Sequence, residues 1–260
     1  MARTKPLPAT IYKYFRINEN LYQLLINNKL WFSYPADFND PYDCYFDFGK
    51  NITEQEAIAF LMEHFAKGET LPEDYDQGSE FVKRSSELIK DKVITPIQEF
   101  ITSASLCCFS ANNKSVLMWS HYADSHRGVC IGFDTKVLLK NFTRIFWVKY
   151  KIKFPELDLL KMPIDSIFDI LANKSNEWQY EKEIRILGEA KGNFPFIKEA
   201  VREIIFGIRT TEEQRTTIVR LANQCKYNVA YRKAIFSKDK YEISFVNFVI
   251  AYPVVTPKIN

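Results

Sequence analysis

Glu181, Glu183 and Arg185 alternate along one segment of the chain, which reads WQYEKEIRIL over residues 178–187. Side chains alternate between the two faces of a β-strand, so we expect these three on one face at a spacing of about 6–7 Å. Two carboxylates beside a guanidinium can act as acid and base, or can stabilise a cationic transition state. The same pattern is typical of a solvated strand face. The sequence leaves both interpretations open.

A second cluster of reactive side chains lies within residues 115–128, which contain Trp119, His121, Tyr122 and His126. Two metal-binding histidines on one helix lie four residues apart, whereas these two lie at positions 121 and 126, so we predict no metal site. The aromatic and imidazole groups favour a cavity wall for a planar ligand, with His121 as hydrogen-bond partner or proton carrier. The alternative is a core helix whose histidines bond to backbone groups.

Two further segments offer polar side chains at a turn and at a strand end. Asn39 and Asp40 precede a proline in a loop that either presents an amide and a carboxylate to a cleft or caps its own turn. Ser110 ends a predicted strand that contains adjacent cysteines at 107–108. We expect these cysteines to be buried structural thiols rather than nucleophiles.

Hydrophobic periodicity predicts the elements that position these residues. We expect strands at 11–15, 30–34, 105–110, 128–134, 146–150, 178–187, 203–208, 229–236 and 241–249. We expect helices at 18–27, from 53, at 79–102, 157–174 and 210–225, the last opened by a capping box of Thr210 and Glu213. Residues 53–103 then form a helical insertion between strands. Strand runs with helices grouped early predict a single α+β domain over residues 1–260.

The composition is that of an ordinary globular protein of 260 residues, with 47% hydrophobic and 26% charged residues. The net charge of +3 is too small to indicate nucleic-acid binding by itself. Gly-rich phosphate-binding motifs of the G-x-G-x-x-G or Walker type do not occur, in keeping with only 8 glycines.

The cysteines and the apolar runs bear on the cellular compartment. The 5 cysteines contain no C-x-x-C pair, which argues against a disulfide framework and a zinc knuckle. No apolar run approaches the roughly 18–20 residues that cross a membrane, and residues 1–10 lack the apolar core of a signal peptide. We therefore expect a cytoplasmic protein in a reducing compartment, with no membrane partner.

Motifs spread over residues 11–208 resemble a bacterial family known as a domain of unknown function, often found beside phage-defence and toxin-type genes. They read LWFS at 30–33, FNDP at 38–41, CFS at 108–110, LMWSHYA at 117–123 and W-x-Y-E-x-E-x-R at 178–185, followed in the central part by His126, Gly128 and Cys130.

The layout of these motifs is also similar to that of the ADP-ribosyltransferase superfamily, whose split mixed or antiparallel sheet carries Glu-x-Glu on a late strand. The resemblance implies NAD as the consumed cofactor, with Glu183 as the catalytic residue that stabilises the oxocarbenium ion and Glu181 as the helper that orients the acceptor. The candidate NAD-binding residues are Tyr14, Arg16, Asn39, Asp40, Ser110, Trp119, His121, Tyr122 and Arg185. Ser110 is not part of a Ser-Thr-Ser triplet, and the first strand offers Tyr12-x-Tyr14-x-Arg16 instead of one anchor.

The leading hypothesis is an NAD-dependent ADP-ribosyltransferase that cleaves the nicotinamide N-glycosidic bond and modifies a macromolecular acceptor, nucleic acid or protein. It would act as a toxin or antiviral effector, with an antitoxin protein as a candidate partner. Two alternatives remain open. One is a metal-dependent nuclease or hydrolase that uses Asp40, His121, Glu181 and Glu183. The other is a non-enzymatic module that senses a nucleotide-like ligand.

Overall fold

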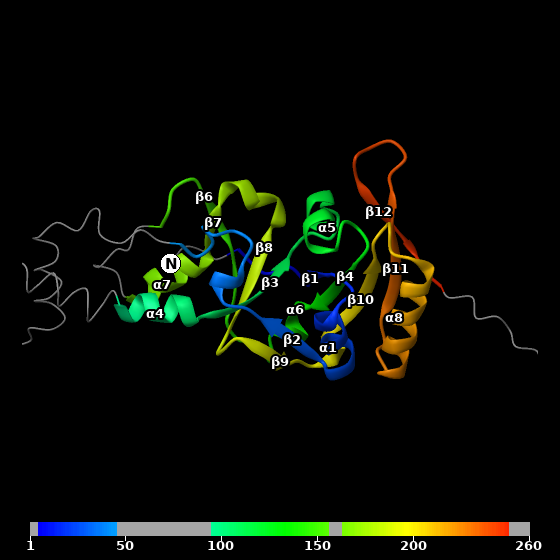
Figure 1. Cartoon of the computed structure of the whole chain (residues 1–260), viewed down its shortest axis with the longest axis horizontal. Coiled ribbons are helices and arrows are strands. Elements are labelled where there is room, and N and C mark those ends of the chain that lie inside the picture. Colours follow the sequence, from blue (N-terminus) through cyan, green and yellow to red (C-terminus); the bar gives the residue numbers. More distant parts are fainter. Residues whose placement is uncertain (1–4, 46–94, 156–162, 250–260) are drawn as a thin grey trace, which may run out of the picture.

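A computed structural model describes residues 5–45, 95–155 and 163–249 (Figure 1). Its strands are β1 (Thr10–Phe15), β2 (Lys29–Phe32), β3 (Ser105–Ser110), β4 (Val129–Asp134), β5 (Ile145–Trp147), β6 (Lys149–Lys151), β7 (Asn173–Ser175), β8 (Glu183–Gly188), β9 (Gly192–Pro195), β10 (Val201–Phe206), β11 (Ala230–Phe236) and β12 (Ile243–Asn247). Its α-helices are α1 (Glu19–Asn27), α4 (Thr95–Ser103), α5 (Val116–Tyr122), α6 (Thr135–Leu138), α7 (Pro163–Ala172) and α8 (Glu212–Gln224). Short 3-10 helices are η1 (Pro35–Asp37), η3 (Asn176–Glu181) and η4 (Lys198–Ala200).

One mixed sheet organises the described residues, with the strand order β12-β11-β10-β4-β1-β3-β8-β5. Its neighbours are antiparallel except β10 and β11, which run parallel and are joined through α8. Strands β1 and β4 pair along their whole length, whereas β1 and β3 share the single register pair Tyr12↔Ser110. The sheet is therefore nearly divided into two halves at the β1–β3 junction.

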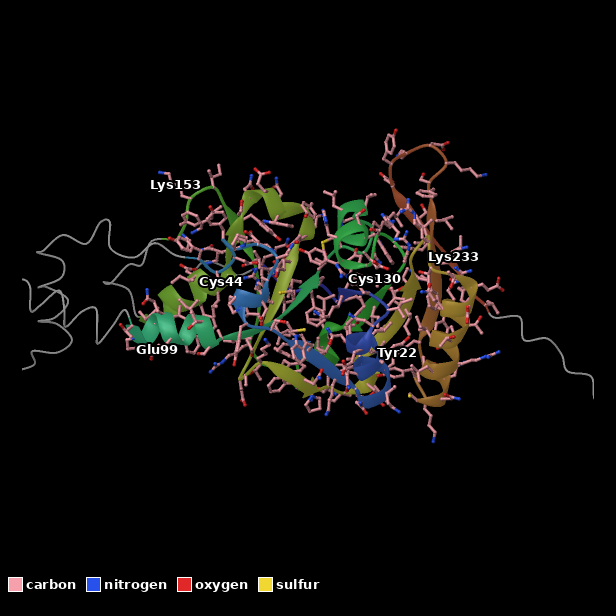
Figure 2. All side chains as sticks on the ribbon, viewed as in Figure 1. Tyr22, Cys44, Glu99, Cys130, Lys153 and Lys233 are labelled. Atoms are coloured by element: carbon pink, nitrogen blue, oxygen red, sulfur yellow. The ribbon has the colours of Figure 1, made fainter. Side chains whose placement is uncertain are left out.

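Helices cover both faces of the sheet because its strands carry apolar side chains on both sides. Ile11 and Phe15 of β1 pack in the main core together with the leucines of α1 and the apolar face of α8. Tyr14 points to the opposite face, where it packs with Trp119 of α5. Figure 1 shows α8 beside β11 at one end of the molecule and α4 with α7 at the other. Cys130 lies buried in the middle, whereas Lys153 and Lys233 lie at the periphery (Figure 2).

The structure confirms the predicted α+β class, since a large mixed sheet packs against several helices. The specific ADP-ribosyltransferase fold and the single-domain organisation stay predictions. Of the predicted helical insertion at 53–103, the part up to residue 94 lies outside the described residues, and the described part is α4. No described helix is long and apolar enough to cross a membrane.

The predicted strand over residues 178–187 is wrong in its first half. Residues Asn176–Glu181 form η3, whose first turn is capped by the Ser175 hydroxyl accepting from the Glu177 amide. Lys182 then takes a left-handed conformation with φ 45°, and the strand begins only at Glu183. The hydrogen bond to the Ser175 hydroxyl favours a helical turn over strand pairing. The alternating pattern therefore predicts a strand where a 3-10 helix forms.

Three smaller boundaries also differ from prediction. The expected strand 146–150 consists of two short strands, β5 and β6, in different sheets. The expected helix 157–174 ends at Ala172, and its last residues form β7. The capping box of α8 is made by Thr211 and Gln214 rather than by the residues one position earlier, because Thr210 is buried and its hydroxyl bonds the Gly128 carbonyl.

Candidate active site

A cavity of about 410 Å³ opens where β1 and β3 diverge. It is lined by consecutive residues of β1, by the end of β3, by the loop after η1, by α5 and by both glutamates of the Glu-x-Glu motif. The volume falls in the range of about 300–1,000 Å³ that small-molecule sites occupy. The Lys13 ammonium donates to the Cys108 carbonyl at 2.9 Å, and so links the two strands beside their single pair. We call this space the acidic cavity, for the carboxylates described next.

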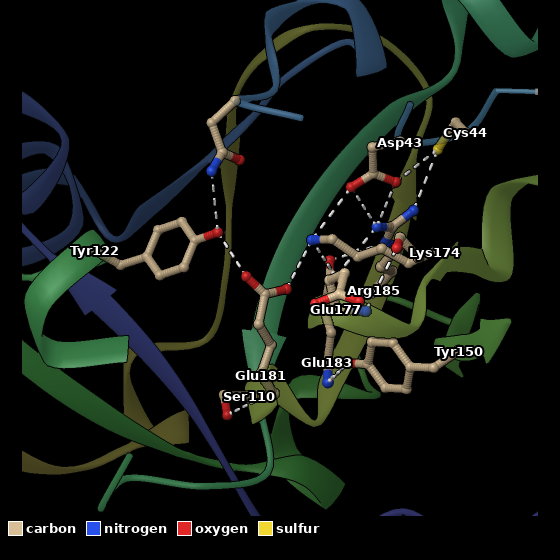
Figure 3. Close-up of polar contacts among 12 residues, drawn as sticks. Asp43, Cys44, Ser110, Tyr122, Tyr150, Lys174, Glu177, Glu181, Glu183 and Arg185 are labelled. Atoms are coloured by element: carbon tan, nitrogen blue, oxygen red, sulfur yellow. Dashed lines mark hydrogen bonds and ion pairs between the residues drawn. The ribbon is translucent and has the colours of Figure 1, made fainter. Parts of the chain in front are cut away.

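Lys174 joins three carboxylates at one end of the acidic cavity (Figure 3). Its Nζ lies 2.7 Å from Glu181 Oε2, 3.0 Å from Glu183 Oε2 and 3.3 Å from Asp43 Oδ2. The side chain is 5% exposed, so these ion pairs are shielded from water. Arg185 supplies the second cation of this buried network.

Arg185 is fully buried and uses its whole guanidinium group inside the protein. Its Nη2 donates to both carboxylate oxygens of Asp43 at 2.7 and 2.8 Å, while Nε donates to Glu183 Oε1 at 2.8 Å. Nη1 donates to the Leu171 carbonyl at 2.8 Å. A buried guanidinium held this way fixes the orientation of its carboxylate partners.

The two glutamates titrate in opposite directions from their ordinary pKa. Burial alone would raise the pKa of Glu183, but Arg185 and Lys174 outweigh burial and hold the pKa well below its usual range. Burial also raises the pKa of Glu181, and there the attraction of Lys174 does not compensate. Three carboxylates against two cations leave one negative charge in excess when all are ionised. Glu183 is therefore a fixed anion, and Glu181 is the member suited to exchange a proton.

Hydrogen bonds hold Glu181 at the edge of the cavity. The Tyr122 hydroxyl donates to Glu181 Oε1 at 2.6 Å, and Asn39 Nδ2 lies 3.5 Å from that hydroxyl oxygen (Figure 3). Ser110 Oγ donates to the backbone carbonyl of Glu181 at 2.5 Å. The Glu183 amide donates to the Tyr150 hydroxyl at 2.7 Å. These hydrogen bonds fix the positions of both glutamates, although the two residues do not lie on one continuous strand.

The acidic cavity brings together most of the residues that the sequence predicted for the site. Those that line it are Tyr14, Arg16, Asn39, Ser110, His121, Tyr122, Glu181 and Glu183. The solvated-strand alternative for the glutamates and Arg185 is wrong, because Glu181 and Glu183 are each 3% exposed and Arg185 is 0% exposed.

Three predicted binding residues lie outside the cavity lining. Trp119 is fully buried in the core under α5, with its indole N–H donating to the Asn113 carbonyl. Asp40 accepts from the Tyr42 amide at 2.9 Å and so caps its own turn. Arg185 reaches the cavity through Glu183 and does not line it. None of the three is therefore placed to contact a ligand in the acidic cavity directly.

Sequence reasoning missed Lys174, Asp43 and Lys13, all of which line the cavity. The sequence predicts Lys174 at the end of a helix, whereas it lies on β7 and is buried. No spacing in the sequence relates residue 43 to residues 174 and 185, so this signal exists only in the folded chain. Cys108 also lines the cavity, and burial raises the pKa of its thiol, as expected of an unreactive cysteine.

Over the described ranges, no three His, Cys, Asp or Glu side chains are grouped so that they could hold a metal ion. The carboxylates that converge are instead bridged by Lys174 and Arg185.

A family model described as "Protein of unknown function (DUF2971)" matches residues 118–186 of the chain. The matched segment runs from α5 to β8 and contains Lys174 and both glutamates. The match confirms the predicted resemblance to a family of unknown function over these residues, whereas the motifs at 30–41 lie outside it. No curated protein and no solved structure matches the chain.

Proposed function

We propose that the protein binds NAD in the acidic cavity and cleaves its nicotinamide N-glycosidic bond, transferring ADP-ribose to a macromolecular acceptor. Cleavage places positive charge on the ribose while nicotinamide leaves with the bonding electrons. An anion that stays ionised next to the ribose lowers the free energy of that transition state. The acceptor, nucleic acid or protein, then attacks the anomeric carbon and gives up a proton.

One observation carries the proposal: two buried carboxylates with opposite pKa shifts, in a network with one excess negative charge, lie at one end of a small-molecule cavity. Glu183, held ionised by Arg185 and Lys174, suits the oxocarbenium ion. Glu181, whose pKa is raised, suits a general base that takes the acceptor's proton. Pairs of titratable groups pushed apart in this way mark acid–base roles.

Other residues that line the same cavity suit the rest of the dinucleotide. Lys13 of β1 and Arg16, which directly follows β1, provide positive charge for a diphosphate. His121 and Tyr122 present aromatic surface beside the carboxylates, where a nicotinamide ring would lie. The toxin or antiviral role rests on the family resemblance alone.

The test is release of nicotinamide from NAD by the full chain, alone and with cell extract, followed with labelled NAD. Loss of one preorganised electrostatic group lowers kcat by about 10²–10³-fold. We therefore expect the kcat for nicotinamide release by Glu183→Gln to be at least about 100-fold lower than that of the unchanged chain. Glu181→Gln should lose transfer to the acceptor more than nicotinamide release. Glu213→Gln, an exposed position on α8, is the control and should keep full activity.

The same assay separates the two alternative functions. Activity that ignores NAD and disappears with a chelator would replace the proposal with a metal-dependent hydrolase. NAD that binds and is recovered intact, with Glu183→Gln altering affinity only, would indicate a sensor module. Full activity in Glu183→Gln would rule out the proposed mechanism.

A further inference from the structure

A second cavity, of about 120 Å³, lies beside the short parallel pair of β6 and β7. Tyr42 and Tyr45 border it from the segment after η1, and Phe154 borders it from the segment after β6. We call it the aromatic cavity. This is smaller than the cavity of about 150 Å³ that holds benzene, so the enclosed space accepts only part of a flat ring system, with the rest lying against the exposed rings.

The three rings of the aromatic cavity contact one another and remain open to solvent. Ring centroids are 4.8 Å apart for Tyr45 and Phe154, 5.7 Å for Tyr42 and Phe154, and 6.2 Å for the two tyrosines. Tyr42 is 60% exposed, and Tyr45 and Phe154 are each 46% exposed. A cluster of exposed aromatic side chains of this kind marks a binding surface rather than a core.

Asn173 provides the second, independent observation. Asn173 is among the residues that line the same cavity, and it is 4% exposed. Neither Oδ1 nor Nδ2 has a hydrogen-bond partner. Buried amides are nearly always paired, so this one lacks a group that presents a donor beside an acceptor. A nucleobase edge such as N6–H₂ and N7 of adenine has that arrangement and is the usual partner of an Asn amide.

The charges around the aromatic cavity favour an anionic ligand over a cationic one. Aromatic groups at mutual angles can also bind a cation. Here Lys151 and Lys153 line the cavity, both are exposed, and no carboxylate is found among its described lining residues. Lys153 lies at the outer end of this region (Figure 2). The lysines repel a cation and attract a phosphate.

We propose that the aromatic cavity binds a nucleotide, with an adenine-type base stacked on Phe154 and paired to the Asn173 amide and its 5′-phosphate near Lys151 and Lys153. Stacking, an amide and flanking positive charge are the combination that single-stranded nucleic acids and free nucleotides share as ligands. The lining of this site shares only Lys174 with that of the acidic cavity, and the proposal does not depend on NAD cleavage.

The experiment measures binding of adenosine 5′-monophosphate to the full chain by calorimetry, with purine riboside 5′-monophosphate and a short oligodeoxyadenylate as companion ligands. Loss of base stacking costs about 1–3 kcal/mol, so Phe154→Ala should weaken binding at least about fivefold. Asn173→Ala should abolish the preference for adenosine over purine riboside, which lacks the amino group. Lys153→Gln should weaken binding and reduce its salt dependence.

Phe236→Ala and Lys238→Gln are matched controls at exposed positions on and beside β11, and both should bind as the unchanged chain does. Because Phe154 is itself exposed, its variant should fold, which thermal unfolding checks. Tighter binding of the oligonucleotide would identify a nucleic-acid strand as the source, and tighter binding of the monophosphate a free nucleotide.

Two results would overturn the proposal. One is the absence of binding by either adenine ligand. The other is loss of binding in Arg16→Ala with no change in Phe154→Ala, which would place the nucleotide in the acidic cavity instead. Nicotinamide release does not enter this assay, so its failure and the failure of NAD cleavage are distinguishable.

Discussion

Glu181 and Glu183 stand two residues apart and share one lysine, yet their environments give them different chemistry. Arg185 donates to both carboxylate oxygens of Glu183 and Lys174 donates to Oε2, so the negative charge is compensated by direct ion pairs. Glu181 has one cation and one neutral hydroxyl. The guanidinium therefore determines which glutamate stays ionised and which can take up a proton.

The first prediction concerns the stability of the network. Glu183→Gln removes the charge that compensates Arg185 and turns an amide donor toward two cations, so the free energy of unfolding should fall by roughly 3 kcal/mol. The amide of Glu181→Gln resembles the protonated carboxyl group that burial favours at this position. This substitution should therefore lower the free energy of unfolding by only about 1 kcal/mol. Urea unfolding of both variants measures the difference. Equal losses would contradict the assignment of the fixed charge to Glu183.

The second prediction concerns pH. The folded pKa of Glu181 lies above its ordinary value of 4.5, so the folded chain binds this proton more tightly than the unfolded chain does. That contribution to stability is complete below pH 4.5 and is lost as pH rises through the raised pKa. Glu181→Gln cannot titrate there, so its stability relative to the unchanged chain should improve from pH 4.5 toward neutral pH. A constant difference across that range would refute the raised pKa.

The pKa of Glu183 is shifted in the opposite direction, so its contribution to stability has the opposite pH dependence and serves as an internal comparison. Its folded pKa is depressed, so its contribution is present above the ordinary pKa and is lost only as pH falls through the depressed value. The deficit of Glu183→Gln should therefore shrink under acid conditions rather than near neutrality.

Among the elements, the connection from η3 to β8 matters most for the site. A left-handed residue at Lys182 replaces the expected strand pairing, yet both glutamates still reach the Lys174 ammonium. Ser110 anchors this connection, because its hydroxyl bonds the Glu181 carbonyl and its backbone pairs with Glu183 in register. Short polar contacts, rather than a continuous strand, position the glutamates.

The third prediction concerns the start of α8. Thr211 accepts from the Gln214 amide, and the Gln214 side chain accepts from the Thr211 amide. Replacing an N-cap threonine costs about 1 kcal/mol, so Thr211→Ala should lower the free energy of unfolding by that amount. Glu213→Gln should change it by less than about 0.5 kcal/mol. Denaturant titration distinguishes this capping box from the one expected a residue earlier.

The sequence predicted the elements whose patterns are local. Leu21, Leu24 and Leu25 marked α1, β-branched and aromatic residues marked β1, and alternating apolar residues marked β4, each close to its observed bounds. It also selected most residues that line the acidic cavity, through motif and resemblance. It could not find the Lys174–Asp43 contact, because the two residues lie far apart in sequence and on different elements. Nor could it separate an exposed strand face from a buried ion network, since both require the same charged residues.

For the molecule as a whole, the main architectural feature is the near-separation of the large sheet at β1 and β3. On one side β4 has full partners in β1 and β10, and on the other β3 has a full partner in β8. The acidic cavity lies at the junction, where a continuous sheet would leave no room. The acidic cavity therefore lies where the pairing between the two halves of the sheet is reduced to one residue pair.

The fourth prediction follows from that architecture. Strands in one cooperative unit share their protection from hydrogen exchange. We expect the amides of β1, β4 and β10 to exchange as one group and those of β3 and β8 as another, with the edge strands β5 and β12 exchanging fastest in each half. Native-state exchange followed by mass spectrometry measures this. A single protection factor for all inner strands would show that the halves open together.

Lys174 has a consequence that reaches across the molecule. Its ammonium is held by the carboxylates of the acidic cavity, while the same residue borders the aromatic cavity. A ligand of the aromatic cavity that displaced this side chain would change the proton affinity of Glu181. By thermodynamic linkage, protonation of Glu181 would then change the affinity for that ligand by the same factor. Lys174 is thus the residue through which binding in one cavity would be coupled to titration in the other.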